Sequence, residues 1–392
     1  MADKENKEKV VLERIDSAID KLKSRDFSVF FYVVDSKNIP NSSMEYTYSI
    51  ALALKKEGYN VKMCYQLANE YTKEQITKLQ RQDKPVDENR VFVGVREWLG
   101  DEYADLEHIN IANGDWAIGP QDFLFIPEAL SSLMLQTYKY HVPCKRVVIL
   151  QNYDYVSDYI PLGTSWATFG INEAIAISDE QAEMLKNVFP YVKTRTLNPG
   201  ISEMFRKPVN GKNLVVNVIA KSQDDINRVI KPFYWKYPLL NFVSFRDLRG
   251  KSKKVFAECL KESAITVWID ENTSFGMSAL EAMRCGNIVI GKLPENLPAW
   301  MGNNDTIYDN GVWFTNINQL PDIISSVVTS WMNDDIPTEL TDAVEKTNQL
   351  YKQEDFEVNV KRIFKEILDE RINEITIIKN AAKNNNNKKS EE

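Results

Sequence analysis

Apolar and polar residues alternate in blocks along most of the chain. Short runs of consecutive apolar residues, such as FSVFFYVVD (27–35) and KRVVIL (145–150), are typical of buried parallel strands. Longer segments with apolar residues at helical spacing lie between them, as in MEYTYSIALALKKEGYNV (44–61). Repetition of this alternation predicts a doubly wound α/β architecture.

The predicted strands fall into two groups separated by a linker. The first group comprises 27–35, 60–66, 90–95, 122–127, 145–150 and 173–178. The second group comprises 214–220, 240–245, 264–270 and 287–293. Between them, NPGISEMFRKPVNGK (198–212) contains two prolines and two glycines and has no apolar period, which is typical of a linker.

The chain of 392 residues is long enough for two domains of ordinary size. A polar, low-complexity segment at its end cannot bury enough apolar area to fold, so it is expected to be disordered. We predict an N-terminal helix (1–26), an N-terminal Rossmann-like domain (27–197), the linker (198–212), a C-terminal Rossmann-like domain (213–335), C-terminal helices (336–380) and a disordered tail (381–392).

Composition narrows the classes of function. The formal net charge of −8 argues against nucleic-acid binding as the main role. No stretch approaches about 18 uninterrupted apolar residues, so we expect no membrane span. The N-terminus is too charged for a signal peptide, and four separated cysteines without a CxxC pair fit reduced thiols. We therefore expect a cytoplasmic protein.

Metal-dependent chemistry finds little support in the sequence. There are two histidines, His108 and His141, which cannot build a His-rich metal site, and neither lies in a recognisable catalytic motif. No Asp-x-Asp motif occurs. We expect neither a bound metal nor an organic cofactor.

The stretch 264–291 combines a strand, a polar loop, a short helix that Gly286 can end, and a second strand. In open α/β sheets, ligands bind beyond the carboxyl ends of strands, where helix N-termini present free N–H groups. Gly276 lacks a Cβ, which would let an anion approach the backbone. The arrangement predicts a diphosphate-binding loop with the candidate residues Thr273, Ser274, Phe275, Gly276 and Met277.

Glu281 lies one turn into this short helix, among apolar neighbours. A carboxylate at this point could accept hydrogen bonds from the two vicinal hydroxyls of a ribose. An ordinary alternative is an i,i+3 ion pair with Arg284 on a solvated helix face. Periodicity alone leaves both interpretations open.

The sequence SFGMSALEAMRCGNIVI (274–290) resembles the donor-sugar signature of retaining GT-B glycosyltransferases, family 4-like. Three other segments resemble that family in the same order: 41–61 its first helix, 176–189 a strand–helix unit, and 198–205 its inter-domain segment. The resemblance covers about 28–330. It implies a GT-B architecture, in which two Rossmann-like domains face each other across a cleft.

In that family, two glutamates separated by seven residues contact the donor, and the second binds the nucleotide ribose. Glu281 matches the second, but Thr273 stands where the first is expected, with Asp270 and Glu271 as nearby substitutes. The family also has an Arg and a Lys that bind phosphate after the first strand of the second domain. The nearest matches here are Lys221 and Arg228, and Arg246 and Arg249 are further candidates.

The acceptor cleft of the family borders its first helix, which implies roles for Ser43 and Glu45. A histidine that the family often has after the strand matching FLFIP is replaced by Glu128, whose alternative role is that of a helix N-terminal acid. The loop after VVIL offers Gln151 and Asn152 to the same cleft.

The resemblance thus implies a glycosyltransferase that moves a sugar from a nucleoside-diphosphate donor to an acceptor hydroxyl with retention and without a metal. Lys221 and Glu281 are the candidate catalytic residues. The acceptor, whether glycan, protein or small molecule, has no readable signature. Because Thr273 replaces a glutamate and the phosphate-binding pair is poorly matched, a catalytically degenerate protein that binds a nucleotide-sugar or a partner is the alternative.

Overall fold

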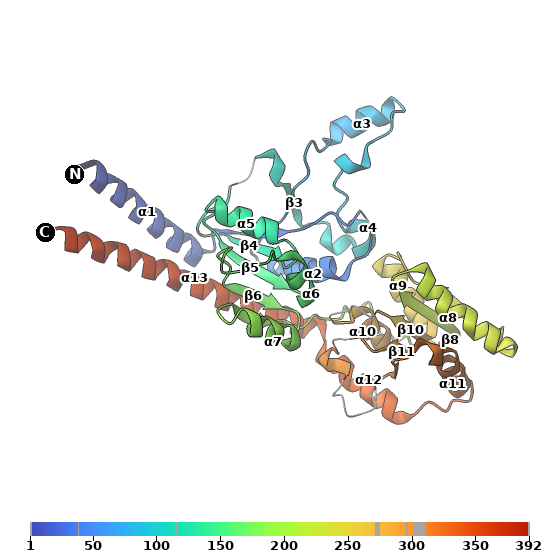
Figure 1. Ribbon diagram of the computed structural model, residues 1–392. Helices are drawn as coiled ribbons and strands as arrows, with labels where there is room; N and C mark the ends of the chain where they lie inside the picture. Colours follow the sequence, from blue (N-terminus) through green and yellow to red (C-terminus); the bar gives the residue numbers. More distant parts are fainter. Residues whose placement is uncertain are drawn as a thin grey trace.

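The computed structural model describes residues 2–37, 39–114, 117–270, 275–294, 297–301 and 310–390. Two α/β domains lie side by side, and two long helices at the chain ends extend together from the first domain (Figure 1). Each domain is built on its own parallel sheet, with seven strands in the first and five in the second. The predicted α/β architecture with two facing domains is confirmed.

The seven-stranded sheet has the order β3-β2-β1-β4-β5-β6-β7, and all its strands are parallel. At its centre Val29 pairs with Val61 on one side and Phe123 on the other. Its strands are β1 (Ser28–Tyr32), β2 (Asn60–Tyr65), β3 (Glu107–Asn110), β4 (Phe123–Pro127), β5 (Lys145–Leu150), β6 (Glu173–Ala176) and β7 (Lys193–Thr196).

Successive side chains of a strand point to opposite sides of the sheet, so its apolar strands present apolar side chains on both faces. Helices cover both of these faces. Phe31 packs in a core with residues of α1 (Ala2–Ser24), α2 (Ser42–Lys56) and α13 (Gln353–Ser390). Its neighbour Phe30 packs on the other face in a core with residues of α5 (Ser131–Lys139), α6 (Tyr153–Tyr159) and α7 (Asp179–Val188).

The five-stranded sheet has the order β12-β11-β10-β8-β9, also parallel throughout. The helices α8 (Gln223–Lys236) and α11 (Leu320–Met332) cover one face. The other face is covered by α9 (Lys253–Glu262) and α10 (Met277–Arg284). The strands are β8 (Asn213–Ala220), β9 (Ser244–Asp247), β10 (Ser263–Ile269), β11 (Ile288–Lys292) and β12 (Val312–Phe314).

After α12 (Thr338–Leu350) the chain returns to the first domain, where α13 packs against α1 and α2. Phe364 of α13 lies in an aromatic cluster with Phe123 and Tyr59, and Arg195 of β7 pairs with two α13 glutamates. The helix continues through residue 390, over most of the segment predicted to be a disordered tail. Residues 391–392 lie outside the described part.

The predicted strand at 90–95 is wrong, and β3 forms the sheet edge instead. The backbone of this segment is held by side chains, because the Asp35 carboxylate accepts the N–H groups of Val93 and Gly94, each at 3.2 Å. Phe92 stacks on Tyr65 with ring centroids 3.7 Å apart. Edge strands β7 and β12 are also absent from the sequence prediction.

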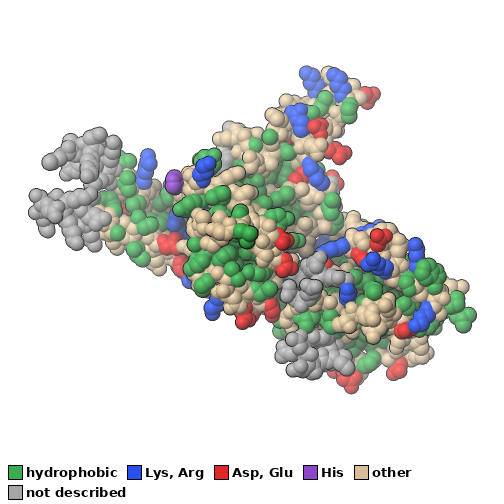
Figure 2. Space-filling view, in the orientation of Figure 1, with side chains coloured by type: hydrophobic (Ala, Val, Ile, Leu, Met, Phe, Trp, Pro, Cys, Tyr) green, Lys and Arg blue, Asp and Glu red, His purple; other side chains and the backbone are tan. Residues whose placement is uncertain are grey.

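Shorter elements complete the structure. An arm between β2 and β3 carries α3 (Lys73–Arg81), which has no buried residue, and Figure 2 shows Lys and Arg side chains at its tip. The remaining elements are α4 (Arg96–Leu99) and 3-10 helices at Glu88–Arg90, Asp101–Tyr103, Ile111–Asn113, Pro238–Leu240, Ala299–Met301 and Ile317–Gln319. Within the described ranges, no helix combines the length and apolarity needed to cross a membrane.

Candidate functional site

A pocket of about 230 Å³ lies between the two domains. It is lined by residues at the N-termini of α2, α9 and α10 and by residues that follow β5, β6, β9 and β10, as expected where parallel strands end. The lining residues used below are Ser43, Glu45, Gln151, Lys251, Lys253, Asp270, Phe275, Gly276, Met277 and Glu281.

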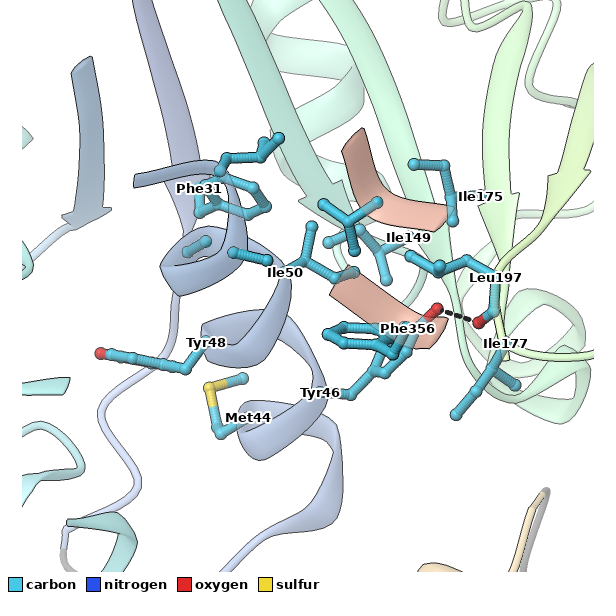
Figure 3. Packing of buried hydrophobic residues seen from close by; sticks show 14 of the residues in the cluster. Phe31, Met44, Tyr46, Tyr48, Ile50, Ile149, Ile175, Ile177, Leu197 and Phe356 are labelled. Atoms are coloured by element: carbon cyan, nitrogen blue, oxygen red, sulfur yellow. Dashed lines mark hydrogen bonds between the residues drawn. The ribbon is translucent and has the colours of Figure 1, made fainter. Parts of the chain in front are cut away.

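Helix α2 carries the first-domain side of the pocket. Asn41 caps its N-terminus by accepting the N–H groups of Ser43 and Met44. In Figure 3, Tyr46 packs beside Phe356 of α13, and its hydroxyl donates to the carbonyl of Leu197 at 2.5 Å. This buried hydrogen bond fixes the rotation of α2, so its neighbour Glu45 and the capped first turn line the pocket.

Helix α10 carries the opposite side. Gly276 in the left-handed region precedes it, and Gly286 (φ +77°) follows it, as predicted. Glu281 lines the pocket although only 2% of it is exposed. Arg284 pairs with Glu203 instead, so the alternative of an i,i+3 pair on a solvated helix face is wrong.

The partner of Glu281 is Lys253, the first residue of α9. The Lys253 Nζ lies 2.5 Å from Oε1 of Glu281 and 2.6 Å from Oε2 of Glu45. Burial alone would lower the pKa of Lys253, but the two carboxylates raise it well above its ordinary value, so the lysine stays protonated. The pKa of Glu281 is raised to about 8, chiefly by burial; the protonated Lys253 opposes this shift, and the Glu45 carboxylate adds to it.

Sequence reasoning missed Lys253, which lies in the run GKSKK (250–254). One signal could have found it. Lys253 falls four and seven residues before Ala257 and Leu260, the buried residues of α9, so it shares their helix face. A lysine on a buried face needs a carboxylate partner, and here it has two.

Gly276 has a packing role in the structure. Its φ is +79°, and a Cβ added to it would lie 2.9 Å from Trp300 and 3.3 Å from Trp268. The space on that side is filled by indole rings rather than being open to an anion. The glycine is therefore required by the backbone conformation and by the packing that positions the start of α10.

We expect Gly276→Ala to destabilise the protein by about 1–3 kcal/mol, because it combines a strained φ with a steric overlap. It should also weaken nucleotide binding in the pocket, if the predicted donor loop binds there, by shifting the first turn of α10. Urea unfolding measures the change in stability, and titration of the folded protein with nucleotide measures the change in binding. Gly211→Ala is the matched control, since its φ is ordinary and nothing lies within 4 Å of the added Cβ. Equal stability of the two variants would contradict this role.

The predicted phosphate-binding residues are not among the described residues that line the pocket. Lys221 is 63% exposed and pairs with Asp270, which does line the pocket, at 2.7 Å. Arg228 lies on α8 near Asp225, with a charged-atom separation of 3.6 Å. Arg246 pairs with Glu262, and Arg249 pairs with Asp247. Of the basic residues on this side, Lys251 and Lys253 line the pocket instead.

The predicted donor loop is described only in part. Thr273, Ser274 and Glu271 lie outside the described residues. Phe275, Gly276 and Met277 all line the pocket, as the sequence predicted. The carbonyl of Phe275 accepts the indole N–H of Trp300 at 2.5 Å, which anchors the end of the loop to the core.

Of the predicted acceptor residues, Ser43, Glu45 and Gln151 line the pocket. The Gln151 side-chain amide donates to the carbonyl of Ser43 at 3.1 Å. Asn152 caps α6 and does not line the pocket. Glu128 is buried outside the lining, and its carboxylate accepts the N–H groups of Gln151 and Asn152, at 3.1 and 2.8 Å. Glu128 therefore shapes the turn that presents Gln151; because α5 begins at Ser131, it is not a helix N-terminal acid either.

Burial raises the pKa of Glu128 to about 7, although three backbone N–H groups, those of Asn152, Gln151 and Glu128 itself, favour its charged form. The folded-state value lies above the unfolded one, so this carboxyl costs stability progressively as pH rises from about 4.5 to about 7. Glutamine does not ionise, so Glu128→Gln should avoid about 1–3 kcal/mol of this loss in the free energy of unfolding. The variant should therefore be more stable than the wild type near pH 8.

Urea unfolding at about pH 5 and about pH 8 checks this dependence. The exposed Glu339, replaced by Gln, is the control and should give the same difference from the wild type at both pH values. The same constant difference for Glu128→Gln would contradict the titration of Glu128 in this range.

Comparisons with known proteins address the fold. The structure is similar to sucrose-phosphate synthase from Thermosynechococcus elongatus, with a TM-score of 0.57 and 12% identity over 87% of this chain and 99% of that chain. It is similar to Anabaena HepE in complex with UDP-glucose (TM-score 0.54, 12% identity, 86% and 99% covered). It is also similar to the pneumococcal O-GlcNAc transferase GtfA in complex with UDP and GlcNAc (TM-score 0.54, 10% identity, 88% and 99% covered).

No protein family model and no curated protein sequence matches the chain. At identities of 10–12%, these structural matches show the fold alone, and they extend over most of each chain. Two parallel sheets flanked by helices, with a pocket between the domains at the strand ends, agree with them. The chain has the GT-B fold of glycosyltransferases.

Proposed function

We propose that this protein transfers a sugar from a nucleoside-diphosphate donor to an acceptor hydroxyl, with retention of anomeric configuration and without a metal. The observation that carries the proposal is the position of Glu281. It is a buried carboxylate on the short helix of the second domain, and it lines the pocket between the domains. The solved structures of similar fold support it, because HepE and GtfA were each solved with a uridine nucleotide.

In this proposal the second domain binds the donor. The Glu281 carboxylate accepts hydrogen bonds from the two vicinal ribose hydroxyls, which are charge-assisted bonds. The diphosphate lies at the N-termini of α9 and α10, where free N–H groups and the helix dipoles favour an anion. The same groups stabilise the charge that develops on the leaving diphosphate as the glycosidic bond breaks.

The first domain supplies the acceptor side through Ser43, Glu45 and Gln151. The acceptor hydroxyl would enter between α2 and the donor, and closure of the domains would exclude water and limit donor hydrolysis. Retention is inferred from the resemblance of 274–290 to the donor signature of retaining enzymes. A nucleotide-sugar-binding module without transferase activity is the second candidate, since Thr273 stands where that signature has a glutamate.

The test is a panel of UDP-, GDP- and ADP-sugars, with release of the nucleoside diphosphate measured with and without excess EDTA. We expect release from one donor class, unaffected by EDTA, and an α- or β-linked product that keeps the donor's anomeric configuration by NMR. Binding without release on a broad acceptor panel would favour the binding module. Absence of binding to every donor would refute both functions.

A further inference from the structure

The charge of the pocket is poorly suited to an anionic ligand as it stands. Among its described lining residues, the carboxylates Glu45, Asp270 and Glu281 outnumber the lysines Lys251 and Lys253. Asp270 pairs with Lys221 outside the lining, at 2.7 Å. The other two carboxylates share one ammonium, that of Lys253. Of the two lysines described in the lining, Lys253 is therefore already paired with carboxylates when a diphosphate arrives.

Lys253 holds a position between the two sides of the pocket. Its ammonium contacts Glu281 of the second domain and Glu45 of the first, and its side chain is 12% exposed. The rings of Phe205 and Phe256 lie 5.2 and 5.9 Å from its Nζ. These aromatic faces keep water from the ion pairs and favour a cation at this point.

The side chain can also reach the pocket. Lys253 is the first residue of α9, and Ser252 before it forms no side-chain cap, so the free N–H groups of the first turn and the ammonium lie at the same helix end. A lysine has a flexible four-carbon stem, and rotation about its last bonds moves the ammonium by a few ångströms, about the distance between neighbouring ligand atoms.

We propose that Lys253 pairs with the ribose-binding carboxylate of Glu281 before the donor binds, and that donor binding is an exchange of partners. The ribose hydroxyls displace its ammonium from Glu281, and the ammonium then binds oxygens of the donor diphosphate. This proposal rests on the proposed donor site, and it identifies Lys253 as the cation that binds the diphosphate there. It makes Lys253 a specificity residue, because only a ligand with phosphates returns a partner to the displaced ammonium.

The exchange has a measurable consequence. A nucleoside without phosphates must break the Lys253–Glu281 pair and leave the buried ammonium with one carboxylate, so it should bind poorly. A nucleoside diphosphate compensates with charge-assisted bonds to the same ammonium. Removing the ammonium should therefore lower the affinity for the diphosphate without lowering that for the nucleoside, which loss of a merely structural ion pair would not do.

The experiment is calorimetric titration with UDP, GDP and ADP, and with the parent nucleoside of whichever diphosphate binds. For Lys253→Met we expect the affinity for the diphosphate to fall about tenfold or more, and that for the nucleoside to stay or rise. Lys254→Met is the matched control, because Lys254 is an exposed neighbour that does not line this pocket, and both affinities should match the wild type.

A second variant, Glu45→Gln, tests the same exchange and is available if Lys253→Met fails to fold. Glu45→Gln leaves Lys253 paired with Glu281 and removes its other charged partner, so the ammonium is freer to bind phosphate. The ratio of diphosphate affinity to nucleoside affinity should rise several-fold, the reverse of the first variant. A proportional loss of both affinities in Lys253→Met, or an unchanged ratio in Glu45→Gln, would overturn the exchange. Absence of binding by the wild type would instead refute the donor site itself.

Discussion

Replacement of Glu281 by Gln is expected to lower donor affinity and kcat/KM by about 10- to 100-fold, equivalent to the loss of charge-assisted hydrogen bonds worth about 1.5–3 kcal/mol. The carboxylate can accept hydrogen bonds from two vicinal hydroxyls, whereas an amide of the same shape offers one oxygen and loses the charge. The change also leaves the buried ammonium of Lys253 with Glu45 alone.

Calorimetric titration with the nucleoside diphosphate, together with initial-rate kinetics, measures this effect. Glu203→Gln provides the control, because Glu203 is 69% exposed, pairs with Arg284 and does not line the pocket. It removes the same charge without touching the donor, so affinity should stay within about twofold of the wild type. Wild-type affinity of Glu281→Gln would remove this residue from the donor site.

The largest effect on stability is expected from Phe364→Ala, at about 3–5 kcal/mol. Phe364 is 2% exposed, and its ring centroid lies 4.8 Å from that of Tyr59 and 5.1 Å from that of Phe123. Truncation leaves a cavity in the core that joins α13 to the first sheet, and aromatic contacts are lost with it.

Chemical denaturation followed by tryptophan fluorescence measures this loss. Ile377→Ala lies on the same helix but is 68% exposed, so its cost should be within about 0.5 kcal/mol. A cost for Phe364→Ala as small as that of Ile377→Ala would mean that α13 contributes little to the core of the first domain. Because Phe356 of this helix packs beside Tyr46 of α2, loosening of α13 should also weaken ligand binding.

Consecutive apolar runs made most strands predictable, since buried parallel strands have apolar residues on both faces. The pattern failed at 90–95, where Asp35 accepts the backbone N–H groups that a neighbouring strand would otherwise bind. It also gave no sign that α13 returns to the first sheet. That placement depends on ion pairs such as Arg195 with Glu370, which join residues far apart in the sequence.

The candidate site was predictable where a short motif carries it. Glu281 and Glu45 match opposite sides of the cleft. The helical spacing of Lys253 from the buried residues of α9 indicates a lysine on a buried face, but it does not place that lysine between the two carboxylates. The position of Lys221 directly after a strand predicts a phosphate-binding cation, yet the structure pairs it with Asp270 and leaves it largely exposed. Which cation lies at the pocket depends on how α9 packs, and helix packing is not encoded in local spacing.

The most direct test of the central claim is a crystal structure with a bound nucleoside diphosphate. The account predicts that the two ribose hydroxyls lie within hydrogen-bond distance of the Glu281 carboxylate, with the diphosphate at the N-termini of α9 and α10. A nucleotide bound elsewhere, with the contact between Glu281 and Lys253 unbroken, would contradict it.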